Sequence, residues 1–473
     1  MSLTKKVAYN TVWQFAGKIV STIIGVAIVA LITRHLGKNG YGQYTTVLAF
    51  VQFFAVIVDF GLYLVLIQEI ADPNKDQKKA VSNIFTIRLV TAAVCFVLAP
   101  LVVLFFPYAA IVKQATIVMS LSFFLFTLAQ VLVALFQKNL TMNKVLIAEV
   151  AGRILFLAAT ALFVYWGKDL LYIVGGNLVF NIIYLAIIFF FARRLVKFGL
   201  AFDFIYWRSI YQKAWPIAIT SLLTLVYFKA DTVILSIYRP EGEVGIYGAT
   251  YKVLEIIGTF PHMFLGLILP ILTTAYVTRD LERFKRVYQK AFDFFLIVTI
   301  PMVVGGSMLA ERIMVFVAGP EFVSAGAVLQ ILLWATAIIF FGSLFGYIIL
   351  AIDQQKKMIP YYIITAILSL ILYFSLIPTY SYWAAAGATV FIEVLYAIFA
   401  WRISYRYSGR ININWIAAPK IVLASTVMAL FLWLAREWHL VILLVGAGAI
   451  YLVVLYLIKG LNKDVLNELR APK

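Results

Sequence analysis

The chain has 473 residues, of which 64% are apolar or aromatic and 13% are charged, and its mean hydropathy is +0.98. This balance excludes a water-soluble protein of this length, which would need polar surfaces around two or three cores. The net charge of +18 is not gathered into a separate basic domain, so nucleic-acid binding is not indicated. The lone cysteine, Cys95, offers neither a disulfide framework nor a metal cluster, and we expect no metal and no cofactor.

Apolar windows of about twenty residues, the length of helix needed to cross a bilayer, recur along the whole chain. They do not alternate apolar and polar residues, as the strands of a membrane barrel would. The sequence therefore predicts an all-α polytopic membrane protein with about fourteen transmembrane helices. The predicted spans are 12–32, 44–68, 83–106, 114–136, 145–166, 170–192, 214–237, 246–274, 289–310, 327–351, 359–377, 384–403, 416–435 and 440–459.

The basic residues predict the orientation, because Lys and Arg in short loops resist translocation. With both termini inside, the inner segments hold 26 of the 39 Lys and Arg residues, the outer segments hold seven, and six lie within spans. The short polar start leads directly into the first span, so we expect no cleavable signal peptide. We therefore expect a multi-pass protein of the cytoplasmic membrane with both ends cytoplasmic.

A weak internal repeat divides the spans into two sets of six. Gly40-Tyr41-Gly42-Gln43-Tyr44 lies between the first two spans, and Glu243-Val244-Gly245-Ile246-Tyr247 lies between the seventh and eighth. Both contain a Gly-x-Tyr motif, at an offset of 203 residues. Repeats of this kind place a binding site at their interface. We predict a six-helix lobe at 1–192, a basic cytoplasmic linker at 193–213, a second lobe at 214–403, and two additional helices with a cytoplasmic tail at 404–473.

Four segments resemble the polysaccharide-biosynthesis, O-antigen-type flippases. They are Leu31-Ile32-Thr33-Arg34-His35-Leu36-Gly37-Lys38-Asn39-Gly40-Tyr41-Gly42-Gln43-Tyr44, Asp59-Phe60-Gly61-Leu62, Asp231-Thr232-Val233-Ile234-Leu235 and Val244-Gly245-Ile246-Tyr247. These flippases belong to the superfamily of multidrug, oligosaccharidyl-lipid and polysaccharide exporters. The resemblance implies a V-shaped pair of lobes, as in the multidrug and toxin extrusion (MATE) transporters. It also implies alternating access and outward movement of a polyprenyl-pyrophosphate-linked oligosaccharide, with polysaccharide-assembly proteins as further partners.

Polar side chains recur on single faces of several spans, where apolar residues would be less costly. Facing lipid, a central Lys, Arg or Asp would cost about 2.5–3.5 kcal/mol, so these faces should line water or one another. We therefore predict a substrate cavity lined by six residues, which are Gln14, Lys18, Arg88, Arg153, Lys229 and Lys252. Snorkelling to the head groups is the alternative for Lys18 and Arg88.

Carboxylates near these cations could form ion pairs with them or bind a coupling ion. Arg153 follows Glu149 by four residues, a spacing that favours a local ion pair. Asp59, Asp231 and Glu255 are candidates for coupling to H⁺ or Na⁺, although hydrogen-bonded packing is equally consistent with Asp59. Membrane lipids are expected partners of the whole chain.

Two other functions fit the composition. A cation-coupled multidrug exporter would share the lobes but usually needs an acidic cavity, whereas the spans of this chain hold at least as many Lys and Arg residues as carboxylates. A membrane-embedded glycosyl polymerase or ligase would need a long outer loop with catalytic residues, and the predicted outer loops are short. The flippase is therefore the preferred function, the exporter is the alternative, and an enzyme is not expected.

Overall fold

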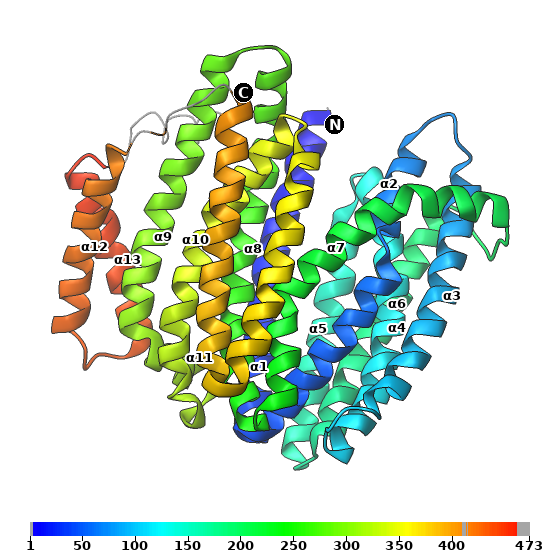
Figure 1. Cartoon of the computed structure of the whole chain (residues 1–473), viewed down its shortest axis with the longest axis horizontal. Coiled ribbons are helices and arrows are strands. Elements are labelled where there is room, and N and C mark those ends of the chain that lie inside the picture. The colour runs from blue at the N-terminus through cyan, green and yellow to red at the C-terminus, as the bar shows by residue number, and fades with distance from the viewer. Residues whose placement is uncertain (1–2, 409–412, 414, 461–473) are drawn as a thin grey trace. The chain divides into compact units, whose positions relative to one another are not determined.

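The computed structural model describes residues 3–408, 413 and 415–460, with side chains from Gly17 onward (Figure 1). Helices are the regular elements of this part of the chain. Their bounds are α1 Leu3–Asp59, α2 Leu62–Ala71, α3 Gln77–Val103, α4 Ala110–Lys138, α5 Met142–Tyr165, α6 Leu170–Leu195, α7 Phe204–Tyr238, α8 Glu241–Val277, α9 Leu281–Ala318, η1 Pro320–Phe322, α10 Ala325–Ala351, η2 Gln355–Met358, α11 Ile359–Tyr407, α12 Ala417–Leu434 and α13 Leu440–Leu457.

Two helices are long enough to cross a bilayer twice, and each reverses at a sharp kink. The described residues contain twelve segments long and apolar enough to be membrane spans, of which Gly17–Ala71 and Gln355–Tyr407 exceed fifty residues. α1 bends at Gly37 and α11 at Ser381, both with positive φ. Counting each of these two segments as a pair of spans gives the predicted fourteen, and the helical membrane fold is confirmed.

The second predicted span, 44–68, is not one continuous helix. It breaks at Phe60 and Gly61, which have φ values of 42° and 76°, and continues as α2. Glycine tolerates this left-handed conformation. A Cβ atom on Gly61 would also lie 2.8 Å from Cβ of Ile217, so the break packs closely against α7. The predicted span 44–68 is therefore divided into two helices at Phe60 and Gly61.

α7 and α9 both begin before the predicted spans that they contain. Asp203 accepts a hydrogen bond from the backbone N–H of Tyr206 and caps α7, and Asp280 caps α9 in the same way through the N–H of Arg283. Such caps satisfy backbone donors at the helix start and let the helix extend beyond its apolar stretch. Residues 204–213, predicted as part of the linker, are therefore helical.

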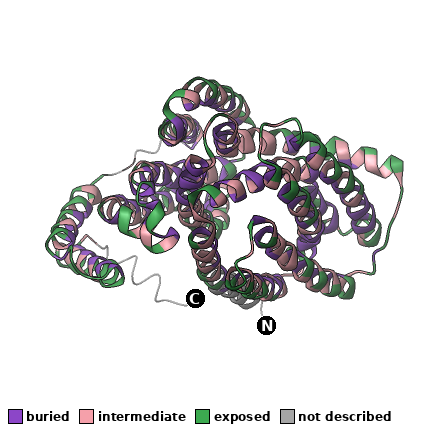
Figure 2. Ribbon diagram, turned by 90° about the horizontal axis from the view of Figure 1, so that it is seen from below, coloured by how far each residue is buried: buried purple, intermediate pink, exposed green. Residues whose placement is uncertain are grey.

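The chain forms two compact units, each with its own apolar core. Within the described residues, unit 1 contains the chain up to Gly248 together with Tyr373–Ser381, and unit 2 contains Ala249–Leu372 and the chain from Tyr382 onward. Figure 2 shows buried residues where neighbouring helices meet and exposed residues on their outward faces. Leu132 and Phe136 of α4 are fully buried in unit 1, as are Phe295 and Phe340 in unit 2.

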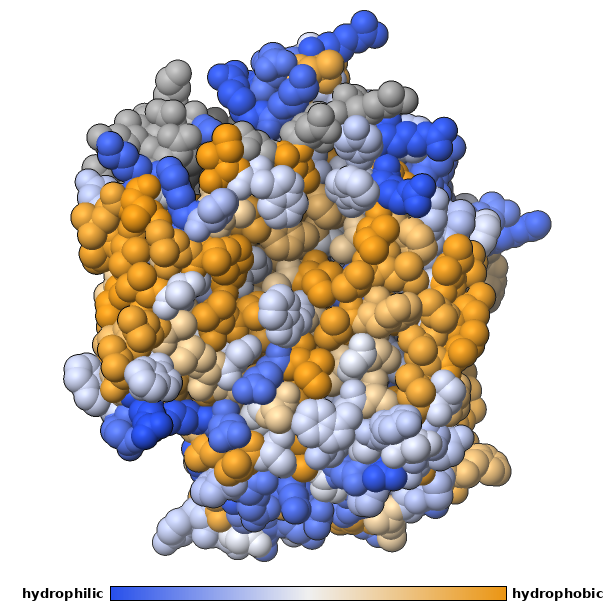
Figure 3. Space-filling view, turned by 60° about the vertical axis from the view of Figure 1, so that its left-hand side comes forward, coloured by the Kyte–Doolittle hydropathy of each residue, from blue (hydrophilic) through white to orange (hydrophobic). Residues whose placement is uncertain are grey.

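Large apolar side chains are exposed along the helices, as expected where lipid is the solvent. Val97 on α3, Ile371 on α11 and Val445 on α13 are each more than half exposed. Figure 3 shows apolar residues over much of the visible face, with hydrophilic residues gathered toward its upper and lower edges. This distribution supports a multi-pass membrane protein.

The segment before α7 is fastened to α3 by side chains that accept its backbone hydrogen bonds. The N–H groups of Gly199, Ala201 and Asp203 donate to Ser82, Thr86 and Asn83, at 3.3, 3.0 and 3.1 Å. The hydrogen bond from the Lys79 ammonium lowers the pKa of the exposed Asp203 carboxyl. Because folding lowers this pKa, the ion pair stabilises the folded protein at neutral pH. This contribution is lost as the pH falls through the pKa of the folded state.

Replacing Asn83 with Ala should loosen this attachment. Asn83 accepts from both Asp203 N–H and the Trp207 indole N–H, at 3.1 and 2.9 Å. Without this acceptor the two N–H groups must hydrogen-bond to water instead. We therefore expect the free energy of unfolding to fall by about 1 kcal/mol. Thermal unfolding in detergent measures it, with exposed Asn74→Ala as the control. Equal unfolding temperatures for the two variants would contradict the attachment.

Candidate functional site

The predicted ion pair on α5 is formed and remains accessible. Nε of Arg153 lies 3.1 Å from Oε1 of Glu149, and their side chains are 30% and 25% exposed. The guanidinium also lies over the ring of Phe180 on α6, 5.9 Å from its centroid. A cation held by one carboxylate and one aromatic face keeps donors available for a ligand anion.

Lys18 lies on the stretch of α1 that packs beside α5. A Cβ atom on Gly17 would overlap Leu146, and one on Gly25 would lie 3.2 Å from Nη1 of Arg153. α1 and α5 therefore run side by side, with two glycines at the contact. Lys18 is half-buried, and seven residues of α5 separate Leu146 from Arg153, which corresponds to roughly 10 Å. The structure thus brings Lys18 and Arg153 to the same pair of helices.

Arg88 lies on α3 and donates hydrogen bonds to acceptors within the protein. Its side chain is 1% exposed, and Nη2 lies 2.5 Å from a carboxylate oxygen of Asp59. Nη1 and Nε donate to the backbone carbonyls of Val58 and Thr127, at 2.7 and 3.2 Å. Arg88 therefore joins the end of α1 to α3 and α4 and is closed to solvent in this structure. This geometry favours a structural role over the predicted contact with substrate.

Asp231, a candidate for ion coupling, is likewise enclosed. It is 1% exposed and accepts hydrogen bonds from the Tyr247 hydroxyl and from the backbone and hydroxyl of Thr232. These residues belong to two of the segments that carry the family resemblance. In the structure the hydrogen bond between Tyr247 and Asp231 joins α7 to the start of α8.

The remaining predicted residues are distributed over both units. Lys229 on α7 is half-buried in unit 1. In unit 2, Nζ of Lys252 lies 2.9 Å from Oε2 of Glu255, with side chains that are 40% and 30% exposed. Gln14 lies outside the residues whose side chains are described. The membrane-spanning helices therefore hold half-buried Lys18 and Lys229, together with Arg153 and Lys252, which are partly exposed beside carboxylates.

Sequence reasoning missed a buried carboxylate at the end of α2. Glu69 is 2% exposed and accepts from Lys213, Lys75 and the Tyr206 hydroxyl, at 2.5, 2.8 and 2.9 Å. Three donors offset the cost of burying one carboxylate. The cluster ties α2 to the first turns of α7, which Figure 1 shows lying at a steep angle to α3 and α4. Its sequence signal was only a charged residue inside an apolar run.

The two Gly-x-Tyr motifs contact each other. A Cβ atom on Gly42 would lie 1.8 Å from the carbonyl oxygen of Glu241, and one on Gly245 would lie 2.0 Å from that of Lys38. The added Cβ of each glycine would also lie 3.0 Å from the backbone N of the other. Since Lys38 and Glu241 are again 203 residues apart, the contacts are reciprocal, as in a local two-fold relation. The start of α8 therefore lies directly against the turn of α1.

Two family models and a relative match parts of the chain. The family model described as polysaccharide biosynthesis protein matches residues 7–276, and the MatE model matches residues 216–376. A putative O-antigen transporter of Shigella flexneri is 21% identical over 339 residues, covering 68% of this chain and 80% of that protein.

Solved structures share the fold at low sequence identity. The lipid II flippase MurJ, in an inward closed conformation, is 15% identical with a TM-score of 0.77, covering 97% of this chain and all of that one. An inward-facing multidrug resistance MATE family transporter is 13% identical with a TM-score of 0.66, covering 85% and 98%. A transporter of the same superfamily from Pyrococcus furiosus is 14% identical with a TM-score of 0.60, covering 87% and 97%. The first family model spans more than half of the chain, and the chain therefore belongs to the polysaccharide biosynthesis protein family, a transporter family of the multidrug, oligosaccharidyl-lipid and polysaccharide exporter superfamily.

Proposed function

We propose that this transporter is a flippase that moves a polyprenyl-pyrophosphate-linked oligosaccharide from the cytoplasmic to the outer leaflet by alternating access. The observation that carries the proposal is the set of partly exposed cations within membrane-spanning helices, of which Arg153 is the best defined. A pyrophosphate leaving water loses hydration that only cations or strong donors can offset. An Arg guanidinium presents a fork of donors that matches phosphate oxygens.

The family and its relatives support this substrate class. The Shigella flexneri relative is named for O-antigen, and MurJ for lipid II. We propose that the two predicted lobes, residues 1–192 and 214–403, move against each other, with both termini in the cytoplasm. The inside-negative potential then assists outward passage, because one elementary charge across 100 mV is worth about 2.3 kcal/mol. Ion coupling through Glu255 would add to this drive but is not required.

Replacing Lys18 and Arg153 together with Ala should slow transport of the glycolipid. Each loses a charge-assisted contact to the head group, so we expect a reduction of about tenfold or more. Arg153→Lys should recover part of the rate, since an ammonium keeps the charge but not the fork. The measurement is the arrival of a labelled polyprenyl-pyrophosphate sugar in the outer leaflet of reconstituted vesicles.

Arg283→Ala provides the matched control. Arg283 is exposed on α9 and close to the predicted cytoplasmic surface, so it removes a cation without touching the predicted path. Its rate should equal that of the unchanged protein. If the Lys18 and Arg153 double variant transports the glycolipid as fast as the unchanged protein, this would argue against a head-group site on α1 and α5.

A cation-coupled drug exporter is the second candidate, and the MatE match over residues 216–376 favours it. Carboxylates would then carry the function, and Glu149 and Glu255 are two accessible carboxylates beside the predicted path. If Glu149→Gln and Glu255→Gln abolish efflux of an organic cation while the double variant of Lys18 and Arg153 leaves glycolipid transport unchanged, the exporter replaces the flippase.

A further inference from the structure

A second cationic site lies wholly within unit 2 and is lined by none of the residues considered above. A cavity of about 1000 Å³ lies between the start and the end of α11. Three cations line it, Lys357 just before α11 and Arg402 and Arg406 on its last turns. The two ends of one helix meet because α11 reverses at Ser381.

The three cations have no carboxylate partner among the described residues. Every ion pair found in the described part of the chain involves other residues, and all three side chains are exposed. Like charges around one cavity repel each other, and their fields add inside it. A bound anion relieves this repulsion, so the cavity is suited to a multiply charged anion.

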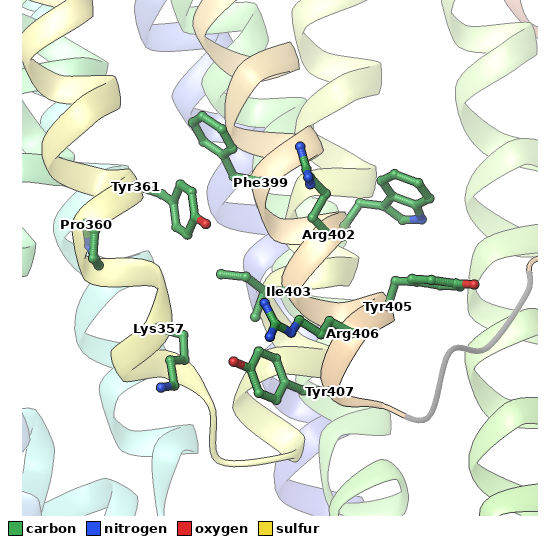
Figure 4. Close-up of a pocket in the computed structure, with 10 residues that line it drawn as sticks. Lys357, Pro360, Tyr361, Phe399, Arg402, Ile403, Tyr405, Arg406 and Tyr407 are labelled. Carbon is green, nitrogen blue, oxygen red and sulfur yellow. The ribbon is translucent and has the colours of Figure 1, made fainter.

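The aromatic lining adds donors and apolar surface. Figure 4 shows Tyr361 beside Phe399, with the hydroxyls of Tyr361 and Tyr407 and the guanidinium of Arg406 directed into the space between the two helical segments. The rings of Tyr361 and Phe399 lie 4.5 Å apart, and Arg406 lies over the Tyr407 ring at 5.6 Å. This combination of hydroxyl donors, forked cations and apolar rings matches a phosphate attached to a lipid.

We propose that this cavity, lined by Lys357, Tyr361, Arg402, Arg406 and Tyr407, binds the phosphate head group of a lipid in the inner leaflet. The loop before α11 and the end of α11 are predicted to be cytoplasmic, and basic pockets between spans on that side suit anionic lipid head groups. The volume exceeds that of one phosphate and holds a head group with its first attached atoms. The inference goes beyond the proposed function, because head-group binding here does not depend on which substrate is transported.

Two lipids carry this chemistry, an anionic phospholipid and a polyprenyl pyrophosphate. The test uses the full chain in detergent, titrated separately with dioleoyl phosphatidylglycerol, farnesyl pyrophosphate and dioleoyl phosphatidylcholine, with bound adducts counted by native mass spectrometry. We expect the protein to retain one tight adduct with at least one of the first two lipids and none with phosphatidylcholine. Retention of phosphatidylglycerol alone identifies a membrane-lipid site, and retention of farnesyl pyrophosphate alone identifies a docking site for the glycolipid carrier.

The variant that tests the cavity is K357Q/R402Q/R406Q, which keeps polar side chains but removes three charges. Its affinity for the retained lipid should fall at least about tenfold, because charge-assisted hydrogen bonds are lost. The control R279Q/R283Q/R286Q removes three exposed cations from the same unit near α9 and should bind as the unchanged protein does. Equal affinity of the cavity variant and the control would overturn the proposal.

A second measurement covers the case in which the triple variant does not fold. Inorganic pyrophosphate, added to the unchanged protein, should displace the retained lipid, and R406Q alone should weaken binding severalfold. Failure of both overturns the proposal. Glycolipid transport by vesicles is measured separately, so loss of head-group binding at this cavity and failure of the flippase proposal give different results.

Discussion

Replacing Arg88 with Ala is expected to lower the free energy of unfolding by about 3–5 kcal/mol, as for other large buried side chains whose removal leaves a cavity and unpaired acceptors. The substitution leaves the carbonyls of Val58 and Thr127 without their donor and removes the partner of Asp59. It also leaves a cavity where a fully buried side chain was. Chemical denaturation in detergent, followed by circular dichroism, measures the change.

Two further variants separate structure from binding at this site. Arg88→Lys can keep one contact with Asp59 but cannot reach all three acceptors, so its loss should be intermediate. Asp59→Asn should cost less than Arg88→Ala, because the Asp59 side chain is 35% exposed and can be hydrated. If Arg88→Ala unfolds as the unchanged protein does but transports no glycolipid, Arg88 would instead be a substrate ligand, as the sequence had suggested.

Features that depend on neighbouring residues were predictable from the sequence. Apolar length gave the spans, and the four-residue spacing of Glu149 and Arg153 predicted their ion pair. The repeat offset identified Gly42 and Gly245 as equivalent positions, but their contact with each other was not predicted. The division into two complete lobes remains a prediction.

Features that depend on distant residues were not predictable. Asp59 and Arg88 are 29 residues apart. Glu69 accepts hydrogen bonds from Tyr206 and Lys213, which are more than 130 residues away. The sequence places Arg88 and Lys18 at a similar depth in the bilayer. At one depth, however, a helix face can point to lipid, to a cavity or to another helix. Only the packing of α1, α3 and α4 shows that Arg88 faces protein.

The family segments illustrate the same limit. Asp59-Phe60-Gly61-Leu62 forms the break between α1 and α2, while Asp231 and Tyr247 join α7 to α8. A sequence comparison identifies such segments without saying whether they bind substrate or shape the backbone. In this structure they form turns and helix contacts, and the predicted cavity residues Arg153 and Lys252 lie outside them.

Adding one methyl group to either motif glycine should have a large effect. Gly42→Ala and Gly245→Ala each place Cβ within 2.0 Å of a backbone carbonyl oxygen on the opposing motif. A carbonyl cannot rotate away as a side chain can, so each substitution should cost about 3 kcal/mol, the upper end for overpacking. Thermal unfolding in detergent measures the loss, and glycolipid transport should fall by more than tenfold if transport requires this contact to form.

The double variant tests whether the contact is reciprocal. Gly42→Ala already separates α1 from the start of α8, so adding Gly245→Ala should cost little more. The losses of unfolding free energy in the two single variants should therefore sum to clearly more than the loss in the double variant. Gly175→Ala on α6 is the matched control, because its Cβ would meet nothing within 4 Å, and alanine favours the helix by up to about 1 kcal/mol. Strictly additive losses would mean that the two glycines act at independent sites, and the local two-fold relation between the motifs would then have no energetic basis.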